Sequence, residues 1–147
     1  MLAHARKVLE DTAKKLNVWK KFTMIEKERA IGMVPVSIDL QTRNEAVDEL
    51  ALSVQYEVPR DIIPYCCFAS YHQIWFDIGN KQLGVQAIQE KMGIGASQTL
   101  HIGDQWQITG NDIAARQCAC GCWVTMPKET RSILEILIAD MQGKTKI

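Results

Sequence analysis

Three charged side chains in the second half of the chain have the types and the spacing of a phosphate-transfer site. Lys81 follows a strand-like run and stands at the start of a predicted helix, where free backbone N–H groups already favour an anion. A lysine there adds a compact positive charge for a phosphate group. Asp104 and Asp112 share a later loop, and two carboxylates on one loop suit Mg²⁺, which prefers hard oxygen ligands. From its position alone, Lys81 has an alternative as a solvated surface lysine.

The loop between the two aspartates also carries neutral oxygen donors, from Gln105, Thr109 and Asn111. Asp104 comes directly after a strand and a glycine, and we predict that it binds the metal. Asp112 has two interpretations that stay open at this point. It is either a second metal ligand, with Asn111 beside it, or the cap of the following helix, because short polar side chains satisfy the first N–H groups of a helix.

Three residues with ring side chains, His101, Trp75 and Trp106, belong to the sequence around the proposed site. His101 lies inside the apolar strand TLHI, and we predict a structural core histidine. Trp75 and Trp106 stand near the proposed site, and each could present a flat face to a base, although core packing is the more common role of a tryptophan. We include Trp75 with Asp77 and Lys81 among the predicted substrate-binding residues.

A nucleophile for phosphate transfer is missing from the sequence motifs. The chain has no Walker-type glycine-rich loop, no GxSxG elbow and no HExxH pair. The only string that resembles a strand-end nucleophile is VSIDLQT, which contains Asp39 and Gln41. A carboxylate there could attack phosphorus, but Gln41 would replace the second acid that protonates a leaving group.

Composition limits the class of protein. The chain has 147 residues, 47% of them apolar, which is enough for one ordinary core. Seventeen basic and seventeen acidic residues cancel, so there is no electrostatic case for nucleic acid or anionic membrane as a partner. No apolar run approaches the roughly 18 residues that span a bilayer, and the charged N-terminal segment is unlike a signal peptide. We therefore expect a cytoplasmic chain.

Five cysteines form an odd set without CxxC spacing, which argues against a disulfide framework and a zinc knuckle. In the run CACGC, the residues Cys118, Cys120 and Cys122 alternate, so on a strand all three would face one side. A soft metal site there is conceivable, but small buried thiols on a core strand are the favoured interpretation.

The first half is predicted to be an α+β segment. Apolar residues recur at three- and four-residue steps over 2–16, which predicts an amphipathic helix. Two strands are expected over 17–25 and 29–38, and the helical period returns over 43–56. The following run, 57–71, contains two prolines and is predicted to be a linker without regular structure.

We place a boundary after this linker, which divides the chain into a segment at 1–72 and a second segment at 73–147. In the second segment, strands alternate with helices. The expected strands are 74–78, 99–102 and 122–125, and the expected helices are 82–92, 111–116 and 127–141. Such alternation is typical of a parallel sheet covered by helices. The predicted fold class is therefore α/β, a partial Rossmann-like parallel sheet with helices on both faces, preceded by an α+β segment.

Five sequence blocks occur in an order typical of one known family. They are KERAIGMVP, IPYCCF, FDIGNKQLGVQAIQ, LHIGDQWQITGNDIAAR and PKETRSIL. In this order, the blocks resemble the C-terminal part of IMP-specific 5'-nucleotidases. The run from Asp77 to Asp112 also resembles the third and fourth motifs of the haloacid dehalogenase superfamily, whose phosphatases use an aspartate nucleophile. The resemblance covers most of the chain from about Lys27 to Leu137.

This resemblance implies an activity and a set of partners. The activity is hydrolysis of inosine 5'-monophosphate (IMP) to inosine and phosphate through an aspartyl-phosphate, with Mg²⁺ as the cofactor. It also implies a homo-oligomer whose activity responds to a nucleotide effector. The first half would belong to the cap that closes over the nucleoside, including Lys27, Arg29 and the residues up to about Ser70.

The resemblance also assigns roles to individual residues. Lys81 matches the lysine that binds the phosphate and stabilises the intermediate, and Asp104 matches the magnesium aspartate. Asn111 and Asp112 complete the fourth motif. Asp77 falls where the family has an acidic residue that faces the substrate.

Two departures from the family pattern affect the prediction. The DxDxT-type first motif and the second-motif serine or threonine have no counterpart, and Asp39 falls inside the expected cap. We therefore predict that the 147-residue chain is inactive by itself and exposes a sheet edge that could pair with a second copy. The run FASYHQIWFD is less polar than the family pattern, which affects base recognition. Two alternatives remain, a non-catalytic nucleotide-binding or assembly module and a sugar phosphatase of the same superfamily.

Overall fold

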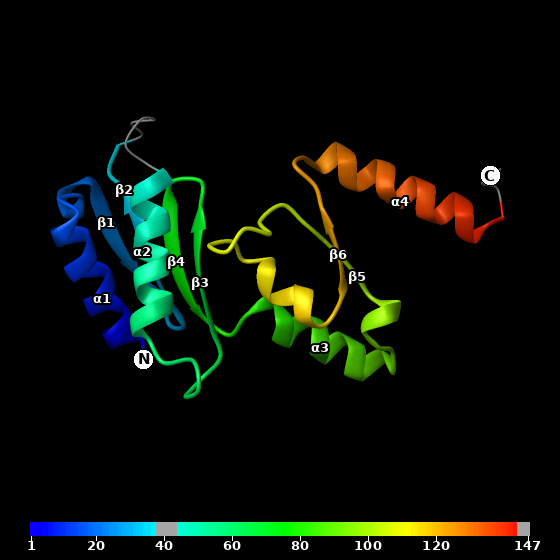
Figure 1. The fold of residues 1–147 in the computed structure, drawn as a ribbon, viewed down its shortest axis with the longest axis horizontal. Coiled ribbons are helices and arrows are strands. Elements are labelled where there is room, and N and C mark those ends of the chain that lie inside the picture. The colour runs from blue at the N-terminus through cyan, green and yellow to red at the C-terminus, as the bar shows by residue number, and fades with distance from the viewer. Residues whose placement is uncertain (38–43, 144–147) are drawn as a thin grey trace.

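The computed structural model describes residues 1–37 and 44–143, which form two regions that follow one another along the chain (Figure 1). The first region contains α1 (Leu2–Lys15), β1 (Phe22–Glu26), β2 (Ala30–Pro35), α2 (Asn44–Glu57), β3 (Tyr65–Ser70) and β4 (Gln73–Ile78). The second contains α3 (Lys81–Met92), β5 (Leu100–Gly103), β6 (Cys120–Trp123) and α4 (Pro127–Met141). Short 3₁₀ helices lie at Trp19–Lys21, Ala96–Gln98 and Ile113–Gln117.

The first region is built on one antiparallel sheet with the strand order β1-β2-β4-β3. Strand β4 lies between β2 and β3, and Asp77 is opposite both Ala30 and Cys66. The prediction that this strand opens the parallel sheet is therefore wrong, and residue 72 lies in the turn of the β3–β4 hairpin. The strand pairs locally because only Tyr71 and His72 separate it from β3, and hairpin pairing needs no crossover.

Strand β3 is a second correction, because 57–71 was predicted to lack regular structure. Both prolines of this run precede the strand, so none of its ladder N–H groups is lost. Its residues alternate between buried and partly exposed, which is the period of a half-buried strand. Tyr65, Cys67 and Ala69 face the core, and Cys66 and Phe68 face the opposite side of the sheet.

Helices α1 and α2 lie side by side and cover one face of this sheet (Figure 1). The core between them includes Leu9, Leu50, Ile74 and Phe76, all with no solvent exposure. Tyr65 stacks on Phe76 with ring centroids 4.7 Å apart. Because side chains alternate along a strand, the uncovered face receives the residues between these core positions, and Asp77 is one of them.

The second region keeps the predicted alternation of strands and helices. Strands β5 and β6 are parallel, with Gly103 opposite Trp123, so the parallel sheet consists of two strands among the described residues. The predicted helix at 111–116 is a 3₁₀ helix, Ile113–Gln117, and the strand expected at 122–125 begins two positions earlier, at Cys120. The α4 helix carries apolar side chains that remain exposed, namely Leu134, Ile136, Leu137, Ile138 and Met141.

The mixed α/β fold class is confirmed, and the helices predicted at 2–16, 43–56, 82–92 and 127–141 are present with small shifts at their ends. Asp39 and Gln41 lie outside the described residues. Among the helices in the described ranges, none combines the length and the apolar character needed to cross a lipid bilayer.

Candidate functional site

Lys81 is the first residue of α3, directly after the turn that leaves β4. Gly79 has φ +94°, a left-handed conformation that favours glycine, and Asn80 caps the helix by accepting a hydrogen bond from the Leu83 N–H at 3.0 Å. The turn therefore fixes where the helix begins. The Lys81 side chain is 41% exposed and stands where the free N–H groups of the helix favour an anion.

Asp112 is the buried anion that holds Lys81. The Lys81 Nζ donates to Asp112 Oδ1 at 2.5 Å, His101 Nε2 donates to the same oxygen at 2.7 Å, and the Gln105 N–H donates to Oδ2 at 2.9 Å. Burial favours the protonated form of Asp112, but the hydrogen bonds from Lys81, His101 and the Gln105 backbone outweigh it, and the pKa lies below its ordinary value. Asp112 is therefore an ionised carboxylate that accepts two hydrogen bonds on Oδ1 and one on Oδ2.

This arrangement excludes one of the two interpretations of Asp112. The residue occupies the cap position of the 3₁₀ helix, but its side chain makes no capping hydrogen bond. The cap interpretation is therefore wrong. The carboxylate instead accepts hydrogen bonds from three donors, and through them it holds Lys81 and the loop in place.

Two glycines let the loop close around Asp112. A Cβ added at Gly103 would overlap the Asp112 carboxylate, and one added at Gly110 would overlap the backbone carbonyl of Gln105. The Asp112 N–H also donates to that carbonyl at 2.9 Å, so Gln105 and Asp112 are joined by two reciprocal hydrogen bonds. The glycines of the GD and TGND sequences are therefore required because a larger residue at either position would overlap the loop.

Asp104 and Asn111 flank the Gln105–Asp112 pair and are the oxygen donors that remain. Asp104 is exposed, and within the described residues its carboxylate makes no hydrogen bond or ion pair. Asn111 Oδ1 is buried and has no hydrogen-bond partner in the same ranges. This donor set fits a hard cation such as Mg²⁺, which takes one or two carboxylates and completes its shell with water and substrate oxygens. Across residues 1–37 and 44–143, no three His, Cys, Asp or Glu side chains form a metal cage by themselves.

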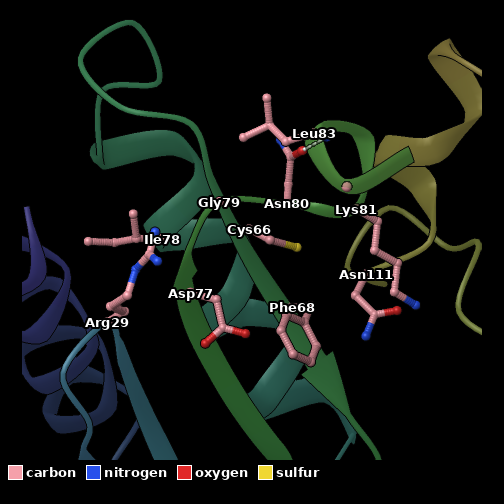
Figure 2. Close-up of a pocket in the computed structure, with 11 residues that line it drawn as sticks. Arg29, Cys66, Phe68, Asp77, Ile78, Gly79, Asn80, Lys81, Leu83 and Asn111 are labelled. Atoms are coloured by element: carbon pink, nitrogen blue, oxygen red, sulfur yellow. Dashed lines mark hydrogen bonds between the residues drawn. The ribbon is translucent and has the colours of Figure 1, made fainter. Parts of the chain in front are cut away.

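A cavity of about 530 Å³ opens between the uncovered face of the sheet and the start of α3. Figure 2 shows Asp77 and Phe68 projecting from the sheet, with Lys81 and Asn111 beside each other at the other wall. Arg29 also lines it. Burial raises the pKa of Asp77, and the charge of Lys27 partly opposes this effect. The cavity therefore combines two cations, one carboxylate and an aromatic ring.

Asp104 does not line this cavity. It lines a neighbouring one of about 340 Å³, together with Tyr71, Gln105 and Trp123. The structure thus brings Lys81, Asp77 and Asn111 together, and joins Asp104 to them only through the loop on which it lies.

The two tryptophans have different surroundings, and the prediction that Trp75 binds the substrate stays a prediction. The Trp75 ring lies against Gly32, where a Cβ would come within 2.6 Å of it, and the Lys27 Nζ lies 4.2 Å from the ring centroid. Trp75 lines neither cavity. Trp106 packs against Gly121 and donates to the Gly103 carbonyl at 3.1 Å, so core packing is the outcome for this residue.

The loop of the site is also bonded to the first region. The Thr109 hydroxyl donates to Asp48 at 2.6 Å, and the Ala69 N–H donates to the Thr109 carbonyl at 2.8 Å. The amide of Gln55 donates to the Cys67 carbonyl at 2.9 Å and to the Ile108 carbonyl at 3.3 Å. These bonds attach the loop between Asp104 and Asp112 to β3 and α2.

The model of one protein family, described as IMP-specific 5'-nucleotidase, matches residues 1–134. The chain belongs to the IMP-specific 5'-nucleotidase family. Among curated relatives, the IMP-specific 5'-nucleotidase 1 of Candida glabrata is 36% identical over 95% of this chain, and that of Saccharomyces cerevisiae is 33% identical over 93%. The chain spans 35% of the length of each of them.

Solved structures of the family share this fold. The N-terminally truncated, IMP-bound IMP-nucleotidase of Plasmodium falciparum is 32% identical, with a TM-score of 0.82 over 91% of this chain and 36% of that one. The ATP-bound IMP-nucleotidase of the same organism is 31% identical, with a TM-score of 0.74 over 94% of this chain and 32% of that one. The resemblance found in the sequence is therefore confirmed.

Within this member of the IMP-specific 5'-nucleotidase family, sequence reasoning missed two residues of the site. His101 was predicted to be a core histidine, but it is 18% exposed and bonded to Asp112. The signal was the alternation in TLHIGD, which places His101 on the same side of β5 as Gly103. Phe68 was missed because its strand was taken for a linker.

The cysteines of this family member are free. Cys118 is buried but precedes β6, Cys120 is exposed and Cys122 is partly buried. The prediction of three buried thiols on one core strand is therefore wrong. Strand β6 begins only at Cys120, and most of its residues are exposed in the described part of the chain.

Proposed function

We propose that this chain provides the phosphate-binding and metal-binding part of a magnesium-dependent 5'-nucleotidase that hydrolyses IMP to inosine and phosphate. The observation that carries the proposal is the Lys81–Asp112 pair, a lysine at a helix N-terminus fixed by a buried carboxylate and open to a cavity. Membership of the IMP-specific 5'-nucleotidase family supports IMP as the substrate.

Lys81 would bind the phosphate. An ammonium group has three N–H donors, and Asp112 accepts a hydrogen bond from one of them. The exposure of the side chain leaves the others for phosphate oxygens. Because the group is already oriented, it can neutralise the charge that develops on the phosphoryl oxygens without reorganising.

The nucleoside would lie in the cavity beside Asp77. The carboxylate of Asp77 can accept hydrogen bonds from ribose hydroxyls, and Phe68 offers a flat ring to the base. Phe68 lies directly opposite Trp75 in the sheet, so we add it to Trp75 as a candidate for stacking on the base. The Arg29 guanidinium adds donors for oxygen atoms of the base or the phosphate.

Asp104 would hold Mg²⁺, and Asp112 would orient Lys81. Asn111 lines the other cavity, so its amide oxygen would join the ion only after the loop between them rearranges. When bound, Mg²⁺ supplies Lewis-acid stabilisation of charge on the phosphoryl oxygens. The Asp104 carboxylate has no hydrogen bond or ion pair within the described parts of the chain, so it would be available to the ion.

An aspartyl-phosphate mechanism also needs an attacking carboxylate, and we infer that a part of the family's polypeptide outside these 147 residues supplies it. Without that group, positioning and charge neutralisation remain but the covalent step is lost. The proposal includes a homo-oligomer in the cytoplasm that responds to a nucleotide effector. The ATP-bound structure of the Plasmodium falciparum relative supports the effector.

The test is an assay of inosine and phosphate release from IMP with and without Mg²⁺. The chain by itself should show no turnover, whereas a chimera that adds the upstream region of the Candida glabrata relative should hydrolyse IMP and lose activity in Asp104→Asn. Hydrolysis of IMP by the 147-residue chain would contradict the proposed division of roles. A chimera that binds IMP without turnover, or that prefers sugar phosphates, would overturn the proposed function in favour of a binding module or a sugar phosphatase.

A further inference from the structure

One oxygen atom of Asp112 accepts hydrogen bonds from two different side chains, Lys81 and His101. We propose that His101 is a positioning residue for Lys81, because its hydrogen bond fixes the carboxylate that in turn holds the ammonium group at the start of α3. The phosphate-binding role of Lys81 rests on the proposed function, whereas the positioning itself is a property of this chain.

The geometry fixes the direction of the hydrogen bond. An ionised carboxylate only accepts, so the 2.7 Å contact requires His101 to carry a proton on Nε2 and donate it. The three donors to Asp112 come from β5, from α3 and from the loop backbone at Gln105. Contacts from three separate elements leave the carboxylate, which is 1% exposed, a single orientation.

The imidazole is itself held in place by packing. The edge of the Trp106 ring meets His101 with centroids 5.5 Å apart and an interplanar angle of 72°. The Trp106 N–H donates to the Gly103 carbonyl, and its ring fills the space that the absent Cβ of Gly121 leaves. The chain of contacts therefore runs from Trp106 through His101 and Asp112 to Lys81.

Lys81 depends on this support because little else restrains it. Its side chain is flexible and 41% exposed, and within the described residues Asp112 is its hydrogen-bond partner. If the His101 donor is removed, Asp112 keeps the Gln105 contact but loses one of the two bonds on the oxygen that faces Lys81. For comparison, losing the hydrogen-bonding partner of a metal-ligating side chain costs about 10- to 100-fold in metal affinity or activity.

The test compares two substitutions of similar length. His101→Gln keeps an N–H donor with similar reach, and His101→Met removes the donor. His4→Met is the matched control, because His4 is an exposed histidine on α1. The measurement is the rate at which trace acetic anhydride acetylates Lys81, read by peptide mass spectrometry against Lys91, an exposed lysine on the same helix.

Relative to Lys91, we expect Lys81 to react about five- to tenfold faster in His101→Met than in the unchanged chain, since one hydrogen bond to a charged group corresponds to about tenfold. His101→Gln should stay within about twofold, and His4→Met should change nothing. Equal Lys81 rates in His101→Met and the unchanged chain would overturn the proposal, as would equal rates in the Gln and Met variants.

Circular dichroism melts are recorded first. If His101→Met does not fold, His101→Asn replaces it, because the shorter amide does not reach Asp112, and the comparison with His101→Gln is unchanged.

A second arm uses the active chimera. There, His101→Met should lower kcat for IMP about tenfold while KM stays within about twofold, and it should have no further effect in a Lys81→Ala background. An additional loss in that background would mean that His101 acts independently of Lys81. Absence of IMP hydrolysis by the unsubstituted chimera would count against the proposed function only, because the acetylation arm needs no substrate.

Discussion

The two regions of the molecule are stabilised in different ways. The first region encloses an apolar core, in which Leu9, Leu50 and Phe76 have no solvent exposure. Among the described residues, the second region has a sheet of two strands, and one of its fully buried side chains is a carboxylate, Asp112, held by polar contacts. Apolar residues of α4, such as Ile136, remain exposed.

This difference separates stability from chemistry. Burial of apolar side chains is the main favourable term in folding, so the first region supplies most of the stability of the chain. In the second region, the buried interactions are hydrogen bonds that orient a few polar groups. Such contacts add little net stability but define the geometry of the groups. Substitutions in the two regions should therefore have different primary effects.

The largest effect is expected in the core of the first region. Phe76→Ala should lower the free energy of unfolding by about 3–5 kcal/mol, since it leaves a cavity under both helices. Ile136→Ala on α4 is the control and should stay within about 0.5 kcal/mol, because that side chain is 63% exposed. Urea denaturation followed by circular dichroism measures both. Similar losses in the two variants would show that one core serves both regions.

Lys81→Ala should affect chemistry more than stability. In the active chimera, we expect kcat/KM for IMP to fall about 100- to 1,000-fold, the usual cost of removing one group that stabilises transition-state charge. Lys91→Ala, on the same helix, should retain activity. A Lys81→Ala variant that keeps normal kcat/KM would remove the basis for assigning the phosphate to this lysine.

Acid should lower the stability of the second region, through Asp112, and remove an unfavourable contribution to the first, through Asp77. Hydrogen bonds lower the pKa of Asp112 in the fold despite its burial, so it stabilises the folded state above the unfolded value of about 3.9. That stability is lost as the pH falls through the folded pKa. Asp77 has the opposite sign, because burial raises its pKa and its unfavourable contribution disappears on protonation.

Hydrogen exchange of β5 and β4 amides between pH 7 and 3, corrected for the intrinsic rates, separates these two contributions. Protection of β5 should fall relative to β4 on acidification, and Asp112→Asn should remove that pH dependence. A constant ratio of protection in the unsubstituted chain would argue that Asp112 is not ionised in the fold.

The smallest effect concerns Cys66, which lines the first cavity. Burial, helped by the Asp77 charge, raises the pKa of this thiol to about 11, although Lys81 partly opposes the shift. Iodoacetamide at pH 8 should therefore label exposed Cys120 about tenfold faster than Cys66, since the thiolate is the reactive form. Labelling of Cys66 should rise as the pH approaches 11. Rapid labelling of Cys66 at pH 8 would show that the sheet face is more open than in this structure.

The sequence was informative where a local pattern determines the structure. The start of α3 could be predicted because a glycine, a capping Asn80 and a helical period follow a strand. The glycine before Asp104 marked the loop of the site correctly.

What could not be predicted is which distant elements meet. The strand Gln73–Ile78 has the same local pattern in a parallel and in an antiparallel sheet, and its partners decide between them. His101 looks like a core residue until Asp112, further along the chain, folds back onto it. The contacts of Trp75 with Lys27 and Gly32, from another hairpin, could not be predicted for the same reason.

The hydrogen bonds that join Thr109 to Asp48 and to Ala69 limit how the two regions can move. They join the loop between Asp104 and Asp112 to β3 and α2. The sheet of the first region therefore cannot move away from this loop without breaking several hydrogen bonds at once. We therefore expect the first sheet and the loop between Asp104 and Asp112 to move together.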